Sequence, residues 1–362
     1  MNIWVAIFEG VAISIASLLV CLMVGGGLRV VTCRNTSWNT LGSSTTSVFW
    51  SLLTGFIVLT TLAALWYARF NSVLLAGGLL LLIGWMIEKR GVYRLKLTLP
   101  WQPDSHSAGR IVLMDLLLVL CGTLIAGSFF ALDGIYSSGG YALLPENDLI
   151  KYSQLAHSHI STGIETPFVE GSAYWYPEQA SPQPYNHFLA WSSGLIATLA
   201  NTPETLATAF VFPLISVFIT LAGALALLNT MGITSAQFKL LAVLAVLAPP
   251  LIYLSWFIGL EHPAPRNLFF FGLSSPLFVL LFIKWLILVL LFIGLLLALA
   301  NQQIAIGASL AFYALFVIPS GVCVAILFST FALYYLVASN QLQYVWPFVF
   351  HGGVAILLFS GY

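Results

Sequence analysis

The feature that most constrains the fold is a series of apolar runs, several of them 18 or more residues long and nearly free of charge. A run of that length is a candidate transmembrane helix, because about 20 helical residues cross the hydrocarbon core of a bilayer. Only 7% of the 362 residues are charged, whereas soluble domains carry about 25%. The sequence therefore predicts an all-α, polytopic integral membrane protein.

We expect about ten of these runs to cross the membrane. They lie at about 3–24, 46–67, 71–87, 111–131, 204–230, 237–259, 275–299, 303–318, 320–338 and 344–361. Residues 1–110 then form an N-terminal extension of three spans and a basic loop, and residues 111–362 form a transmembrane core. Residues 132–188 form a large loop within that core.

The charged residues divide between two polar segments of opposite character. Segment 88–110 holds five of the twelve basic residues, whereas segment 132–188 holds six of the twelve acidic residues and one lysine, Lys151. Short loops rich in Lys and Arg stay in the cytoplasm. We therefore expect segment 132–188 and the N-terminus to be extracytoplasmic. The membrane we expect is the cell (inner) membrane of a bacterium or archaeon. The formal net charge is zero, which indicates no nucleic-acid partner.

The acidic segment is predicted to contain two short helices. Its aromatic residues argue against a disordered linker. In DLIKYSQLAHSHIS, apolar residues recur near helical spacing, which predicts an amphipathic helix capped by Asn147 or Asp148. YNHFLAWSSGLIATLAN predicts an interfacial helix with Tyr185 and Trp191 at the level of the lipid headgroups.

The first predicted helix carries the main candidates for chemistry. Asp148 could act as a general base or hold a divalent metal, or it could simply cap the helix. His157 and His159 are two positions apart, so they point to different faces of a helix and do not predict a shared metal site. Either His157 or His159 could face a substrate phosphate beside Lys151, and His187 could do the same from the second helix. The alternative for each is a solvated or hydrogen-bonded loop histidine.

Further candidates lie in the next outer loop and inside the spans. GLEHPAPRNLFFFG, residues 259–272, contains Arg266, which could grip phosphate oxygens or anchor the loop at the interface. Asp115 and Lys284 fall within predicted spans, where a charge is costly and is a functional candidate by default. Snorkelling toward the membrane surface is the alternative for both residues.

The order of motifs from residue 111 onward resembles the GT-C superfamily of membrane glycosyltransferases. DLIKYSQLA supplies Asp148, Tyr152 and Ala156 at the spacing D-x-x-x-Y-x-x-x-A, Gly163 follows, and SPQPYNHFLAW is similar to the family's proline-containing stretch. The resemblance implies sugar transfer on the outer face from a polyprenyl-phosphate-linked donor. It implies Asp148 as the base or as a metal ligand. The residues implied around the donor are Lys151, Tyr152, His157, His187 and Arg266.

Two other functions remain open from the sequence. Members of the family commonly have two adjacent acidic residues at this position, but here Asp148 is followed by Leu149 and the second acid is missing. Its absence favours a non-catalytic membrane subunit that binds other membrane proteins. A transporter would use the charges within the spans, but the sequence contains no convincing internal repeat. Lipids are the expected surroundings in every case.

Overall fold

In the computed structural model, every element among the described residues is helical, which confirms the predicted all-α class. The structure describes residues 3–32, 44–69, 72–90, 113–131, 147–165, 187–259, 275–301, 303–317, 321–338 and 345–360. Helices occur at each of the ten predicted apolar runs and at the two predicted short helices of the acidic segment.

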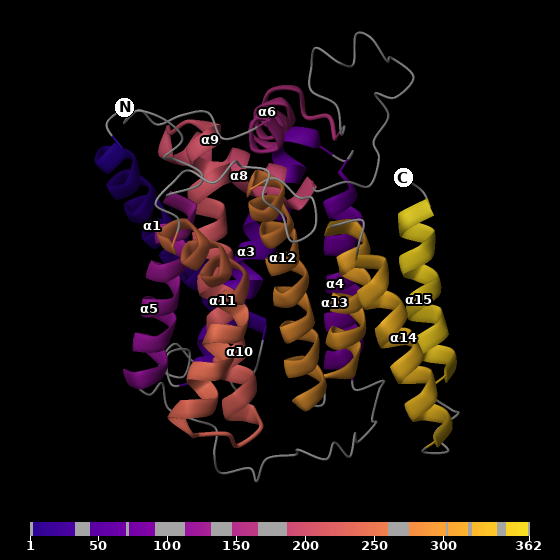
Figure 1. The fold of residues 1–362 in the computed structure, drawn as a ribbon. Helices are drawn as coiled ribbons and strands as arrows, with labels where there is room; N and C mark the ends of the chain where they lie inside the picture. Colours follow the sequence, from indigo (N-terminus) through magenta and orange to yellow (C-terminus); the bar gives the residue numbers. More distant parts are fainter. Residues whose placement is uncertain are drawn as a thin grey trace.

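The helices follow one another along the chain with bounds close to the predicted ones (Figure 1). They are α1 (Ile3–Thr32), α3 (Thr45–Ala68), α4 (Val73–Lys89), α5 (Leu113–Phe130), α6 (Asn147–Thr162), α8 (His187–Ala200), α9 (Glu204–Leu206), the π-helical turn η3 (Ala207–Val211), α10 (Phe212–Thr230), α11 (Ala236–Gly259), α12 (Ser275–Ala300), α13 (Ile304–Val317), α14 (Gly321–Ala338) and α15 (Val345–Ser360).

The long helices run alternately up and down in one bundle (Figure 1). The short helices α6, α8 and α9 lie at the upper end in that view, and the turn between α10 and α11 lies at the lower end. Among the described residues, three helices are long and apolar enough to cross a membrane, namely Trp4–Val31, Thr45–Ala68 and Glu204–Thr230. We call the upper end the α6 end and the lower end the opposite end.

The described charges are distributed unequally between the two ends. Glu9, Arg69, Asp148, Lys151, Glu165 and Glu204 lie toward the α6 end, and Arg29, Glu88, Lys89, Arg90, Asp115 and Lys239 lie toward the opposite end. Acidic residues therefore dominate the α6 end and basic residues the opposite end. This asymmetry agrees with the one found in the sequence, although Arg69 and Lys151 lie at the acidic end and Glu88 and Asp115 at the basic end.

The core lies around α10, which packs against α3, α5, α11 and α12. In the continuous helix Glu204–Thr230, 78% of the most apolar stretch is buried, whereas the corresponding value for α1 is 17%. α1 therefore lies at the edge of the bundle. It contacts α3 closely, because a Cβ atom at Gly25 would collide with the Ser51 carbonyl and one at Gly55 would collide with the Cys21 carbonyl. Small residues at such crossings are typical of helices packed in lipid.

The first apolar helix is longer than predicted. α1 continues to Thr32 and carries Arg29 in its last turn, whereas the predicted span ends at about residue 24. The Arg29 guanidinium donates hydrogen bonds to the Ser47 carbonyl at 2.6 Å and to the Ser51 hydroxyl at 3.0 Å. The acceptors near the start of α3 satisfy the Arg29 guanidinium when Arg29 lies in the last turn of α1. They therefore favour continuation of α1 through this residue.

Candidate functional site

The helix α6 forms the centre of the candidate site. It begins at Asn147, so Asp148 lies in its first turn, where a carboxylate is favoured by the helix dipole. The Asp148 side chain lies outside the described part of the structure. One face of α6 is buried and includes Tyr152, Leu155, Ala156 and His159, whereas Gln154, His157 and Ser161 are exposed. The predicted amphipathic helix is therefore confirmed.

α6 packs against α8 at very short range. A Cβ atom at Gly194 of α8 would lie 2.6 Å from Cγ1 of Ile160 and 2.8 Å from the Ala156 carbonyl. Glycine at this position therefore allows the two helices to touch. Ten of the fourteen residues of α8 are buried, among them Trp191, which is 0% exposed. Trp191 cannot act as a lipid-facing anchor, because its ring lies inside the protein.

Two buried histidines join α6 to α8. Nε2 of His159 lies 2.9 Å from Nδ1 of His187, and the two residues are 0% and 1% exposed. Burial lowers the pKa of His159 well below its usual value, and the neighbouring His187 lowers it further, while the Leu155 carbonyl acts in the opposite direction. His159 is therefore neutral at neutral pH, and one of the two rings donates a hydrogen to the other.

A buried carboxylate joins the end of α6 to the start of α4. Glu165 is 1% exposed and accepts hydrogen bonds from the Ser72 hydroxyl, from the Val73 backbone N–H at 2.6 Å and from the Trp191 indole N–H at 2.6 Å. The Val73 bond satisfies a free N–H at the N-terminus of α4, where a negative charge is also favoured. Gly163 makes this turn possible, because its φ of +71° suits glycine and a Cβ atom there would collide with the Tyr67 carbonyl.

These contacts form one connected unit, which we call the polar layer: Ser72, His159, Glu165, His187 and Trp191. Within it, the His159 ring meets the Trp191 ring edge-on, with centroids 5.1 Å apart. Trp191 in turn stacks on Tyr67 at 6.3 Å. The polar layer therefore fixes α6 and α8 on the ends of α3 and α4, and it determines where the first turn of α6 lies.

The substrate-binding residues predicted from the sequence separate into three groups. Tyr152 and His187 are each 1% exposed, so their contacts are with the protein interior. His157 is exposed and lies 2.8 Å from the Glu204 carboxylate, and Lys151 is half-buried. Arg266 lies outside the described residues. Only Lys151 and His157 are thus described at the protein surface near Asp148.

Four members of the polar layer were not predicted as site residues. Glu165 was counted only among the acids of the loop, and Trp191 as an interfacial aromatic. His159 was an alternative to His157 as a phosphate contact, and its burial beside His187 shows that this alternative is wrong. The sequence signal for Glu165 is its position two residues after Gly163, where a chain reversal can turn a carboxylate back toward the bundle. The sequence signal for Ser72 is its position directly before an apolar helix, where serine is a preferred cap. In the structure its hydroxyl accepts a hydrogen bond from the Leu74 N–H at 3.2 Å.

A second polar cluster lies at the opposite end of the bundle. Lys239 donates to Oδ1 of Asp115 at 2.6 Å, and both side chains are almost fully buried. Asn229 donates to Oδ2 of Asp115 at 2.8 Å, and the Thr45 hydroxyl donates to the same oxygen at 3.1 Å. Asp115 therefore neither snorkels nor lines an open path. The Lys284 side chain lies outside the described part of the structure.

The described residues contain no group of three His, Cys, Asp or Glu side chains that could hold a metal ion. What the site offers chemically is a carboxylate at a helix start, with an ammonium and an imidazole on the same short helix. That set can accept a proton and neutralise an anion. No family model, curated protein or solved structure matches this chain.

Proposed function

We propose that the chain is a membrane glycosyltransferase that moves a sugar from a polyprenyl-phosphate-linked donor to an acceptor on the extracytoplasmic face. The observation that carries the proposal is the placement of α6. This short amphipathic helix, with Asp148 in its first turn, lies across one end of a bundle of apolar helices and is held there by the polar layer. The GT-C-like order of motifs supports the same function.

The proposal includes ten membrane spans, with α6 and α8 outside. Support comes from the alternating directions of the long helices, from their apolar composition and from the excess of basic residues at the opposite end. Helices of 14 to 17 residues, such as α13 and α4, are short for a bilayer of average thickness. Local thinning of the bilayer accommodates such helices at modest cost.

In the proposed reaction, Asp148 takes the proton of the acceptor hydroxyl as its oxygen attacks the anomeric carbon of the donor sugar. The bond between that carbon and the phosphate oxygen breaks, and polyprenyl phosphate leaves with the bonding electrons. Lys151, His157 and Arg266 are assigned to the phosphate, because cationic groups stabilise the charge that develops there. A divalent metal held by Asp148 would serve the same purpose. Tyr152 and His187 are assigned to positioning α6, since both are buried.

The test is transfer from polyprenyl-phosphate-linked sugars by the full chain reconstituted in lipid vesicles, with release of polyprenyl phosphate as the readout. Asp148→Asn should lower the rate by about 100-fold or more, as expected for loss of a general base. Ser161→Ala, at the exposed far end of α6, should leave the rate unchanged. Transfer by Asp148→Asn at the wild-type rate would remove Asp148 from the reaction.

A second function is favoured by one observation. Two of the residues predicted to bind substrate, Tyr152 on α6 and His187 on α8, are buried inside the protein. This burial suits a subunit whose α6–α8 unit serves assembly with another membrane protein. In that case a partner chain would co-purify in fixed proportion with both the wild type and Asp148→Asn, and neither preparation would release polyprenyl phosphate.

A further inference from the structure

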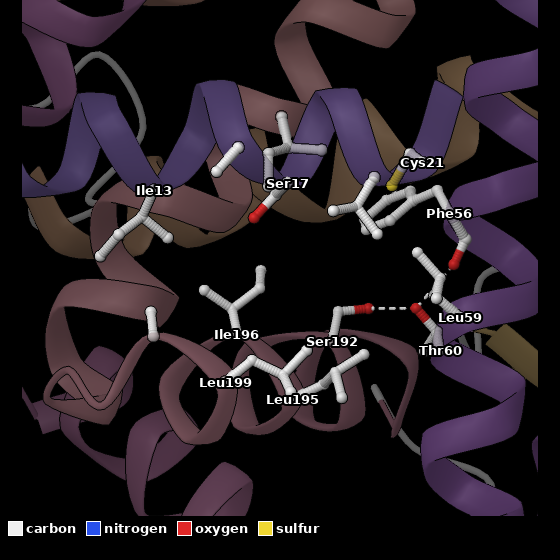
Figure 2. A pocket seen from close by; sticks show the side chains of 14 residues that line it. Ile13, Ser17, Cys21, Phe56, Leu59, Thr60, Ser192, Leu195, Ile196 and Leu199 are labelled. Atoms are coloured by element: carbon white, nitrogen blue, oxygen red, sulfur yellow. Dashed lines mark hydrogen bonds between the residues drawn. The ribbon is translucent and has the colours of Figure 1, made fainter. Parts of the chain in front are cut away.

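An apolar cavity lies beside the candidate site, between α1, α3, α8 and α10. Its volume is about 230 Å³, and its lining is mostly aliphatic, with Ile13, Leu195 and Ile196 among the side chains that face it. Figure 2 shows α1 on one side of the cavity, α8 on the other and α3 closing one end. None of the polar-layer residues lines it.

Two contact points hold α1 on the bundle and leave the cavity between them. Toward the α6 end, the Thr202 hydroxyl donates to Glu9 at 2.7 Å, and Gly10 is so close to Phe210 that a Cβ atom would collide with the ring. Farther along α1, Gly25 contacts the Ser51 carbonyl with similarly little room. The cavity occupies the stretch from Ile13 to Cys21 between these contacts.

The cavity opens at the edge of the bundle. Ala16 and Val20 on its α1 side are exposed, and Leu199 on its α8 side is 75% exposed. Because α1 is the least buried of the three helices long enough to span a membrane, this opening faces whatever surrounds the protein. On the proposed membrane insertion, those surroundings are lipid chains.

The chemistry of the walls selects a hydrocarbon occupant. Thr60 and Ser192 are 1% exposed, and their hydroxyl oxygens lie 2.9 Å apart (Figure 2). Each of the two hydroxyl groups has one hydrogen. The acceptors within reach are the Phe56 carbonyl for Thr60, the Phe188 carbonyl for Ser192, and the oxygen of the other hydroxyl. Neither of these two hydroxyl hydrogens is therefore left for a polar ligand, and the Ser17 hydroxyl on the α1 side is the one other side-chain oxygen in an otherwise apolar lining. Apolar cavities of about 150 Å³ take up benzene, so this one has room for several carbons of a chain but not for a partner helix, which is about 10 Å wide.

We propose that this cavity binds one acyl chain of a membrane phospholipid, which enters sideways between α1 and α8. The proposal rests on the membrane insertion that is part of the proposed function, but it does not require glycosyl transfer. The bound chain fills the space between the two contact points of α1. It thereby supports α8 on the side that faces α1.

The test uses the full chain in phosphatidylcholine vesicles that contain a small fraction of phosphatidylcholine with a photoreactive diazirine on one acyl chain. Crosslinked residues are located by mass spectrometry. Ile196 is the informative residue, because it lines the cavity but is only 9% exposed. Lipids that merely surround the protein cannot reach it. We expect a crosslink at Ile196 in the wild type.

The variant Ser17→Phe should fill the cavity, since the Ser17 side chain points into it (Figure 2). The yield at Ile196 should then fall by about tenfold. Ile15→Phe is the matched control, because Ile15 is 55% exposed on the same helix and does not line the cavity. This variant should keep the wild-type yield. If Ser17→Phe does not fold, Leu195→Phe fills the cavity from the α8 side.

Three results would overturn the proposal. The first is no crosslink at Ile196 although exposed residues of α1 are labelled. The second is an Ile196 crosslink that survives both filling variants. The third is loss of the crosslink on addition of polyprenyl phosphate but not of unlabelled phosphatidylcholine, which would identify an isoprenoid chain as the occupant. Transfer activity is measured in the same vesicles, so that these results are distinguished from failure of the glycosyltransferase proposal. A protein that does not insert into the membrane would carry no crosslink at any residue.

Discussion

At the scale of single residues, Glu165 joins the polar layer through three hydrogen bonds. All three of its hydrogen-bond partners are donors, and all of them are buried. Glu165→Gln keeps the shape but turns an NH₂ group toward those donors. We expect this change to lower the free energy of unfolding by about 2 kcal/mol, because a buried donor is left without an acceptor.

The measurement is the thermal unfolding midpoint in detergent. Glu204→Gln provides the matched control, because the Glu204 carboxylate is partly exposed and pairs with His157 at the surface. Loss of an exposed pair costs less than about 1 kcal/mol. Equal shifts for the two variants would show that Glu165 contributes no more than a surface carboxylate.

His159 predicts a dependence of stability on pH. Burial lowers its pKa in the folded protein, whereas an unfolded histidine binds a proton near pH 6.5. Below about pH 6.5 the unfolded state therefore binds more protons, and the free energy of unfolding falls as the pH falls. The loss continues until the pH reaches the lowered pKa of the folded state.

Unfolding midpoints between pH 7.5 and pH 5 should reveal this effect. His159→Gln removes the titrating group and should make the decline shallower. His157→Gln, at an exposed position two residues away, should keep the decline of the wild type. Identical declines in all three proteins would exclude His159 as their source.

At the scale of helices, Asp115 joins α5 to α11, because its partner Lys239 lies in the first turn of α11. Removal of one member of a buried ion pair leaves the other charge uncompensated. We expect Asp115→Ala to lower the free energy of unfolding by about 3–5 kcal/mol. The unfolding midpoint in detergent measures this loss.

The double variant Asp115→Leu with Lys239→Met is the control. A hydrophobic pair of similar volume often replaces a buried ion pair without loss, so most of the stability should return. A double variant as unstable as Asp115→Ala would show that Asn229 and Thr45, rather than Lys239, determine the stability contributed by the carboxylate.

The helices themselves were predictable, but their side-chain partners were not. Apolar runs and the spacing around Tyr152 locate the long helices and α6, since both signals are local. The pairing of His159 with His187 joins positions 28 residues apart, and that of Asp115 with Lys239 joins positions 124 apart. Such contacts depend on which helices become neighbours, and hydropathy carries no information on that choice. Trp191 was misplaced for this reason, because an amphipathic aromatic suits a lipid interface and a buried carboxylate equally well.

At the scale of the whole molecule, the proposed chemistry requires that the α6 end face outward. The inference rests on the basic residues at the opposite end, such as Arg29 and Lys89 in the last turns of α1 and α4, because Lys and Arg close to the ends of membrane spans are retained in the cytoplasm. The acidic α6 end then meets a donor whose sugar and phosphate lie at the outer surface. The reverse orientation would place Asp148 in the cytoplasm and remove the proposed reaction.

The most direct test is labelling of single cysteines by a membrane-impermeant maleimide in a variant from which all four native cysteines are removed. Ser161→Cys reports on the α6 end, and Arg90→Cys and Thr234→Cys report on the opposite end. All three positions are exposed. We predict that Ser161→Cys is labelled in intact cells and that the other two react only after the membrane is opened. Labelling of Arg90→Cys or Thr234→Cys in intact cells, with Ser161→Cys protected, would contradict the proposed orientation and the function that depends on it.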